Sequence, residues 1–192
     1  MYLKTSNKNE VLLSEIFVDD IIFGGNDEER NKFAKEMKKE FQMSMIWEMK
    51  YFLRLQIVHN KEGIFISQTK YLKDLLKRFG LETFKLVETP MVTGHKLSTK
   101  DETPTVEKNK YKSMIWGLQY LTHTRPDIEN AFGIIARFQV NPKEPHFTAI
   151  KRIFRYLKGT LEFGLGYDKS NDFSLSSYID ANWASSMDEI GR

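Results

Sequence analysis

Two adjacent acidic residues, Asp19 and Asp20, stand between apolar runs at 11–18 and 21–24 that are rich in β-branched and aromatic residues. This pattern predicts a β-hairpin with both carboxylates at its tip. Holding like charges together beside apolar surface costs free energy, and a bound divalent cation removes that cost. Carboxylate oxygens are ligands that Mg²⁺ prefers. The pair therefore indicates either a magnesium site suited to phosphoryl transfer or a solvated Asp-Asp turn.

Basic residues form a second pattern that could carry chemistry. Lys151, Arg155 and Lys158 recur at helical spacing with Arg152 beside them, and apolar residues occupy the opposite stripe. Such a stripe can follow nucleic-acid phosphates and give affinity that falls steeply with salt. The solvated face of an ordinary amphipathic helix has the same pattern, so both interpretations stay open. A further group of basic residues allows the same two interpretations: Lys70, Lys73, Lys77 and Arg78.

Composition narrows the kinds of site that the chain can hold. With 192 residues and 41% hydrophobic content, the chain can bury a real core. The absence of cysteine excludes disulfides, thiol nucleophiles and thiolate zinc sites, and the four histidines lack ligand spacing. No apolar run is long enough to span a bilayer, so we expect a soluble intracellular protein with no membrane partner. A pI near 8.9 permits local basic faces.

The acidic pair needs strands and a helix to position it. Asn26 precedes acidic residues at 27–29, after which apolar residues recur every four positions, and this predicts a helix directly behind the hairpin. The other expected elements are, in chain order, strands at 51–58 and 63–67, a helix over 72–79 ended by Gly80, a connector over 86–109, helices at 111–123, 126–139 and 144–157, and strands at 161–167 and 173–179.

The segment Phe17-Val18-Asp19-Asp20 resembles the aromatic-Val-Asp-Asp box of reverse transcriptases, and further segments are similar to those of the copia-type LTR retrotransposon family. Residues 51–57 and 63–80 resemble that family's primer-grip hairpin and the helix after it. Further similar segments follow in family order, at Thr89-Pro90-Met91, 120–128, 152–160 and, resembling the opening strand of a tethered ribonuclease H, 180–184. The resemblance covers nearly the whole chain.

The resemblance implies an α+β fold: a partial right-hand polymerase palm, a helical thumb and connection, and a C-terminal β-hairpin that begins a ribonuclease H-like sheet. Residues 1–85 would hold the second half of the palm with the primer grip and first thumb helix, and 86–110 an extended connector. Residues 111–160 would form the helical thumb and connection, and 161–192 the truncated start of the ribonuclease H-like domain.

The resemblance also implies roles for particular residues. Asp19 and Asp20 would be two of three carboxylates that hold two Mg²⁺ ions in an RNA-directed DNA polymerase, acting on an RNA/DNA primer-template and deoxynucleoside triphosphates. Asp180 matches the first metal-binding aspartate of ribonuclease H. Nucleic-acid contacts are expected from two groups of residues: the primer grip at Tyr51, Phe52, Leu53 and Arg54, and the basic helix at Lys151, Arg152, Arg155 and Lys158.

The third carboxylate lies on an upstream palm strand in the family, so we expect a fragment that does not polymerise alone. Two alternatives are a non-catalytic nucleic-acid-binding remnant and a poorly folded pseudogene product. The resemblance also implies action in cytoplasmic virus-like particles and in the nucleus, and we expect no targeting signal in this chain.

Four residues depart from the family's pattern. Trp47, Arg54 and Trp116 stand where glycine is expected, and Asn182 where aspartate is common. Large side chains at such glycine positions should strain the backbone, which favours a degenerate genomic copy. The rival hypothesis is that Arg54 adds a phosphate contact.

Overall fold

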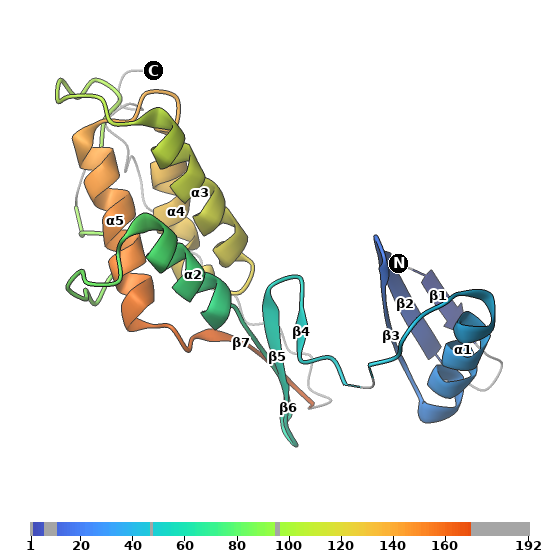
Figure 1. The fold of residues 1–192 in the computed structure, drawn as a ribbon. Coiled ribbons are helices and arrows are strands. Elements are labelled where there is room, and N and C mark those ends of the chain that lie inside the picture. The colour runs from blue at the N-terminus through green and yellow to red at the C-terminus, as the bar shows by residue number, and fades with distance from the viewer. Residues whose placement is uncertain (1, 6–10, 47, 95–96, 170–192) are drawn as a thin grey trace. The chain divides into compact units, whose positions relative to one another are not determined.

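The computed structural model describes residues 2–5, 11–46, 48–94 and 97–169, which form two compact units, Met1–Met49 and Lys50–Arg192 (Figure 1). The described residues form antiparallel sheets and five α-helices. This mixed architecture agrees with the predicted α+β class. The four predicted domain divisions remain predictions.

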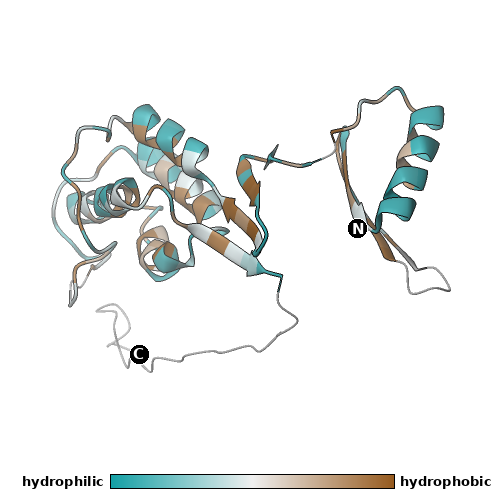
Figure 2. Ribbon diagram, turned by 90° about the horizontal axis from the view of Figure 1, so that it is seen from below, coloured by the Kyte–Doolittle hydropathy of each residue, from teal (hydrophilic) through white to brown (hydrophobic). Residues whose placement is uncertain are grey.

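The first unit is a three-stranded antiparallel sheet with one helix packed on it (Figure 1). Its strands β1 (Tyr2–Thr5), β2 (Val11–Phe17) and β3 (Asp20–Gly25) lie in sequence order, and α1 (Asp27–Glu40) follows. The side chain of Asn26 caps α1 by accepting a hydrogen bond from the amide of Glu29 at 2.8 Å. Figure 2 shows α1 as largely hydrophilic. The hairpin and the helix were predicted, whereas β1 was not.

The second unit begins with a four-stranded antiparallel sheet, in the order β4 (Tyr51–Phe52), β5 (Leu55–His59), β6 (Gly63–Ser67) and β7 (Gly164–Asp168). The predicted single strand at 51–58 is wrong. Leu53 and Arg54 have φ angles of 45° and 63°, so they form a left-handed turn between β4 and β5.

Strand β7 joins residues that are far apart in sequence. It pairs with β6 along its whole length, from Gly164 opposite Ser67 to Asp168 opposite Gly63. A Cβ added at Gly63 would lie 2.0 Å from the Tyr167 carbonyl oxygen, so this close approach requires glycine. The pairing with β6 was not predicted. The strand expected beside it, 173–179, lies outside the described residues.

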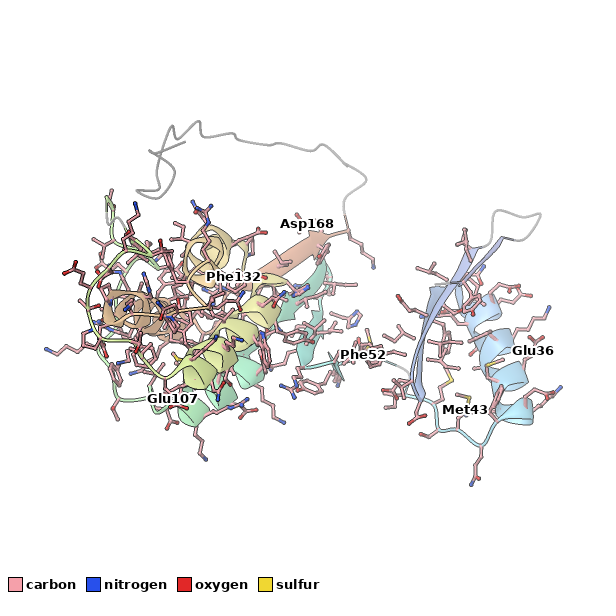
Figure 3. All side chains as sticks on the ribbon, turned by 90° about the horizontal axis from the view of Figure 1, so that it is seen from above. Glu36, Met43, Phe52, Glu107, Phe132 and Asp168 are labelled. Atoms are coloured by element: carbon pink, nitrogen blue, oxygen red, sulfur yellow. The ribbon has the colours of Figure 1, made fainter. Side chains whose placement is uncertain are left out.

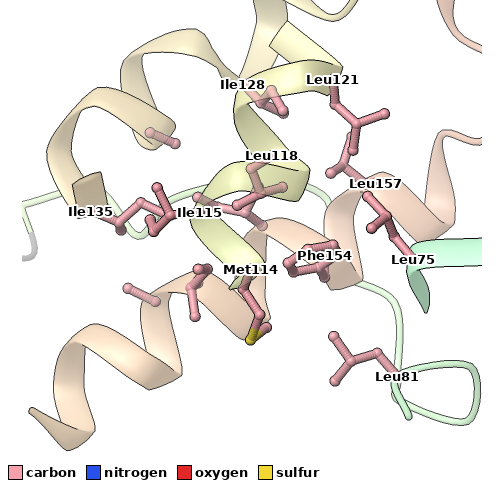
Figure 4. Packing of buried hydrophobic residues seen from close by; sticks show 14 of the residues in the cluster. Leu75, Leu81, Met114, Ile115, Leu118, Leu121, Ile128, Ile135, Phe154 and Leu157 are labelled. Atoms are coloured by element: carbon pink, nitrogen blue, oxygen red, sulfur yellow. The ribbon is translucent and has the colours of Figure 1, made fainter. Parts of the chain in front are cut away.

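Helices α2 (Thr69–Phe79), α3 (Lys108–Thr122), α4 (Glu129–Ala136) and α5 (Glu144–Gly159) enclose the main core (Figure 4). The predicted helix over 126–139 is shorter, since a 3₁₀ turn occupies Pro126–Ile128 before α4 begins. None of the described helices has the length and apolar character needed to cross a bilayer. Ile128 on the 3₁₀ turn is fully buried. Equally buried apolar side chains on α3, α4 and α5 include Leu118, Leu121, Ile135, Ile150, Ile153, Phe154 and Leu157.

Trp116 does not strain this core, so that expectation is wrong. Trp116 is 66% exposed on α3, and its backbone φ angle is not positive. The close packing falls instead on the next residue, Gly117, where an added Cβ would lie 3.0 Å from a methyl carbon of Leu75 on α2. The predicted need for a small residue was thus misplaced by one position. Trp47, the other predicted site of strain from tryptophan, lies outside the described residues.

An ion pair between the buried Arg125 and the partly exposed Asp127 holds the ends of the helices together. Arg125, whose side chain is 3% exposed, donates from Nε and a terminal nitrogen to the two carboxylate oxygens of Asp127, at 2.9 and 2.7 Å. It also donates to the carbonyl and hydroxyl oxygens of Thr160, at 2.8 and 2.6 Å. The hydroxyl of Tyr156 donates to Asp127 at 2.8 Å. This Arg125 clamp ties the α3–α4 corner to the end of α5.

We expect Asp127→Asn to destabilise the second unit by about 2 kcal/mol at neutral pH, because the buried Arg125 charge loses its counterion. Burial alone would raise the pKa of the Asp127 carboxyl, but hydrogen bonds from Arg125 and Tyr156 and the charge of Arg125 hold that pKa below its ordinary value. The stabilisation is therefore present above the ordinary aspartate pKa and is lost as pH falls through the depressed value. Urea unfolding at several pH values measures the difference. The exposed acid Glu129 supplies the control, Glu129→Gln, and a pH-independent gap between Asp127→Asn and wild type would contradict the assignment.

Replacing Trp116 with glycine tests the corrected location of close packing. We expect Trp116→Gly to lower the free energy of unfolding by roughly 0.5 kcal/mol, since glycine weakens a helix interior and no strain is relieved. Circular dichroism during denaturant titration measures this change. A more stable variant would show that the tryptophan strains α3 after all.

Candidate functional site

The acidic pair lies at a hairpin tip, as the sequence predicted. Phe17 pairs with Asp20 at the end of the β2–β3 ladder, which leaves Val18 and Asp19 as a two-residue loop. Val18 has φ 53° and is 80% exposed. A positive φ at the first loop residue is typical of a type II′ hairpin turn, where glycine is usual. For a β-branched residue this conformation is strained, and such strain clusters at functional sites.

The strand register adds an acid that the sequence analysis overlooked. Glu15 lies opposite Ile22, and Phe17 lies opposite Asp20. Because Glu15 is two residues before Phe17 on the same strand, Glu15 and Asp20 are diagonal neighbours on one face of the sheet. Alternation along the strand was the signal that could have identified Glu15. The described residues contain no group of three or more His, Cys, Asp or Glu side chains arranged to hold a metal ion.

The two carboxylates at the hairpin tip nevertheless suit magnesium in the type of ligand atom that they offer. Asp19 and Asp20 are exposed and offer only carboxylate oxygens. Mg²⁺ in proteins is commonly held by one or two carboxylates, with water and substrate phosphates completing its octahedron. The tip therefore suits a metal ion shared with a phosphorylated ligand better than a site made only of protein atoms.

The predicted primer-grip residues gather beside α2. Arg54 extends over the ring of Tyr71, 5.1 Å from its centroid, and Lys70 lies 5.5 Å from the centroid of Tyr51. The hydroxyl of Tyr120 donates a hydrogen bond to the carbonyl of Leu53. Burial raises the pKa of the Tyr71 hydroxyl, although the Arg54 charge opposes that rise. Phe52, labelled in Figure 3, belongs to β4 and is half-buried.

Three of the four predicted basic residues on α5 contact the segment 84–89 of their own chain. Arg152 donates to the carbonyl and hydroxyl oxygens of Thr89, at 3.2 and 3.0 Å. Arg155 donates to the carbonyl of Lys85 at 2.6 Å, and Lys158 to that of Phe84 at 2.9 Å. The ammonium group of the fourth residue, Lys151, lies 4.0 Å from the centroid of the Phe147 ring. All four basic residues are half-buried. Their role toward nucleic acid stays a prediction.

Two residues that the sequence analysis singled out at the C-terminal end of the chain, Asp180 and Asn182, lie outside the described residues.

Comparison with known proteins extends the family resemblance. Residues 1–93 match the model of the family described as reverse transcriptase (RNA-dependent DNA polymerase). The chain is 37% identical over 91% of its length to the retrovirus-related Pol polyprotein from transposon RE1 of Arabidopsis thaliana, and 33% identical over 98% to that from transposon TNT 1-94 of Nicotiana tabacum. It spans only 12% and 15% of those polyproteins.

A shorter relative is similar over most of its own length. The uncharacterized mitochondrial protein AtMg00810 of Arabidopsis thaliana is 33% identical over 88% of this chain and 70% of that protein. No solved structure matches the chain. The identity over nearly the whole chain places it in one family: it belongs to the reverse transcriptases of copia-type, retrovirus-related transposon Pol polyproteins.

Proposed function

We propose that this chain supplies part of the catalytic centre of an RNA-directed DNA polymerase, with Asp19 and Asp20 as its metal-binding carboxylates. The observation that supports this most directly is the strained Val18 turn, which holds two adjacent acids at the end of a six-pair ladder. A solvated Asp-Asp turn has no need of a left-handed valine, whereas a site that must present carboxylates in a fixed direction does.

In this proposal the chain's residues position groups for nucleotidyl transfer. Asp19 and Asp20 hold magnesium, which when bound neutralises the phosphates of a deoxynucleoside triphosphate and lowers the pKa of the primer's 3′-hydroxyl. Tyr51, Phe52, Leu53 and Arg54 contact the primer-template. The finer assignments of palm, thumb and connection belong to this proposal. So does the start of a ribonuclease H-like domain at 161–192, with Asp180 as a metal ligand.

Metal binding at the tip can be measured without polymerase activity. We expect Mn²⁺, used as a probe for Mg²⁺, to bind weakly to the wild-type chain in isothermal titration calorimetry, and Asp19→Asn plus Asp20→Asn to weaken it by about tenfold or more, since both charged ligands are lost. Glu28→Gln removes an exposed acid outside the hairpin and should leave the binding unchanged. Equal binding by all three proteins would rule out a site at the tip.

We expect no primer extension by the 192-residue chain alone. Two-metal transfer needs more protein ligands than the pair at the tip, and no three-ligand group exists within the described residues. The assay uses an RNA template, a DNA primer, deoxynucleoside triphosphates and either Mg²⁺ or Mn²⁺. Processive extension that disappears in Asp19→Asn would show that the centre is complete.

The second candidate function is nucleic-acid binding without catalysis, which the basic and aromatic side chains around the β4–β5 turn favour. Fluorescence anisotropy with a labelled RNA/DNA hybrid should show affinity that falls as salt rises, with a slope of about −0.9 in log K against log salt for each phosphate neutralised. Binding that survives Asp19→Asn plus Asp20→Asn supports this function. A hybrid that fails to bind even at low salt would exclude it.

A further inference from the structure

A cavity of about 300 Å³ lies in the second unit, between the β4–β5 turn and α2. This volume is at the lower limit for small-molecule sites. It can hold a phosphate group and part of the molecule that carries the phosphate. Seven residues line it, and all except Leu75 are charged or carry a hydroxyl: Tyr51, Arg54, Lys70, Tyr71, Asp74, Leu75 and Arg78. The chemistry of this lining suits an anion.

The cavity's cations come from two elements. Lys70, Asp74 and Arg78 follow one another at four-residue spacing on α2, so they share one face of that helix. Arg54 reaches the same cavity from the left-handed turn before β5. The family resemblance predicts glycine at position 54, and the φ of 63° agrees with that preference. This arginine therefore occupies a strained position and adds a cation to a cavity that already holds two.

The two guanidinium groups are held in place by neighbouring side chains. Arg54 lies over the ring of Tyr71, and Arg78 donates a hydrogen bond to the hydroxyl of Ser113 at 3.2 Å. The Arg78 guanidinium also lies 5.6 Å from the centroid of the Phe79 ring. Side chains that are already ordered lose less conformational entropy when a ligand arrives.

The positive charge of the cavity is only partly balanced. Asp74 is the one carboxylate in its lining, against three cations. Among the residues that the structure describes, none of these four charged groups forms an ion pair within 4.0 Å. Three cations that converge on one carboxylate leave an excess of like charges that repel one another, and an anion with several oxygens would relieve that repulsion.

We infer that this cavity binds a phosphate group of the nucleic-acid backbone, with Arg54 as the ligand specific to this chain. The inference rests on the proposed binding of a primer-template. A guanidinium donates two parallel hydrogen bonds to phosphate oxygens, which lysine cannot do. Tyr51 is 50% exposed at the edge of the cavity and offers a ring face to the adjacent sugar or base. A free nucleotide shares the same phosphate chemistry and is the competing source.

The test compares full-length variants in anisotropy titrations with a labelled RNA/DNA hybrid. Arg54→Gly and Arg78→Ala should each weaken binding about tenfold and make the salt slope shallower by about 0.9. Lys61→Ala is the control, because it removes one exposed charge from the β5–β6 turn, outside the cavity, and should change affinity much less. Circular dichroism melting of Arg54→Gly should match wild type, since relief of the left-handed backbone offsets loss of the Tyr71 contact.

The outcomes separate this inference from the proposed function. If the wild-type chain does not bind the hybrid, the proposed function fails and the inference fails with it. If the wild-type chain binds but Arg54→Gly and Lys61→Ala weaken binding equally, only general charge is at work and the cavity is not a site. If deoxythymidine triphosphate binds wild type but not Arg54→Gly, while hybrid affinity is equal in both, the cavity takes free nucleotides and the backbone assignment is overturned.

Discussion

The guanidinium of Arg125 carries a full positive charge away from solvent, and this single constraint organises the second unit. A buried charge is tolerated only when it is paired and its donors are satisfied. Here both requirements are met by residues from different elements, Asp127 before α4 and Thr160 after α5. Because α5 ends beside the α3–α4 corner, the chain that leaves it returns to the sheet, and β7 can pair with β6.

The segments that carry the family resemblance mostly contact one another. Arg125 binds Thr160, and Arg152 binds Thr89. Thr124 donates to the buried Gln68 at the junction of β6 and α2, at 2.7 Å. These residues therefore hold the second unit together. They do not by themselves identify which residues touch nucleic acid, and the hydrogen bonds made by the α5 stripe have the same internal character.

Local pattern predicted the acidic hairpin, the helix behind it and the four helices of the core, because hydrophobic period and capping residues are properties of short segments. It could not predict the β6–β7 pairing, since the partners are separated by about a hundred positions and no short-range signal links them. The break at Leu53 and Arg54 was missed because neither residue type favours a left-handed backbone. The lining of the anion cavity depends on this turn between β4 and β5, so the sequence pattern could not predict which residues line the cavity.

Different contacts hold the strained, left-handed backbones of Val18 and Arg54 in place. Val18 is largely exposed, so no packing offsets a cost of about 1–3 kcal/mol, and only the β2–β3 ladder fixes its conformation. Arg54 is supported by its own side chain, which contacts Tyr71. The direction of the two acids therefore depends on the length and register of the sheet, whereas the position of the Arg54 guanidinium depends on α2.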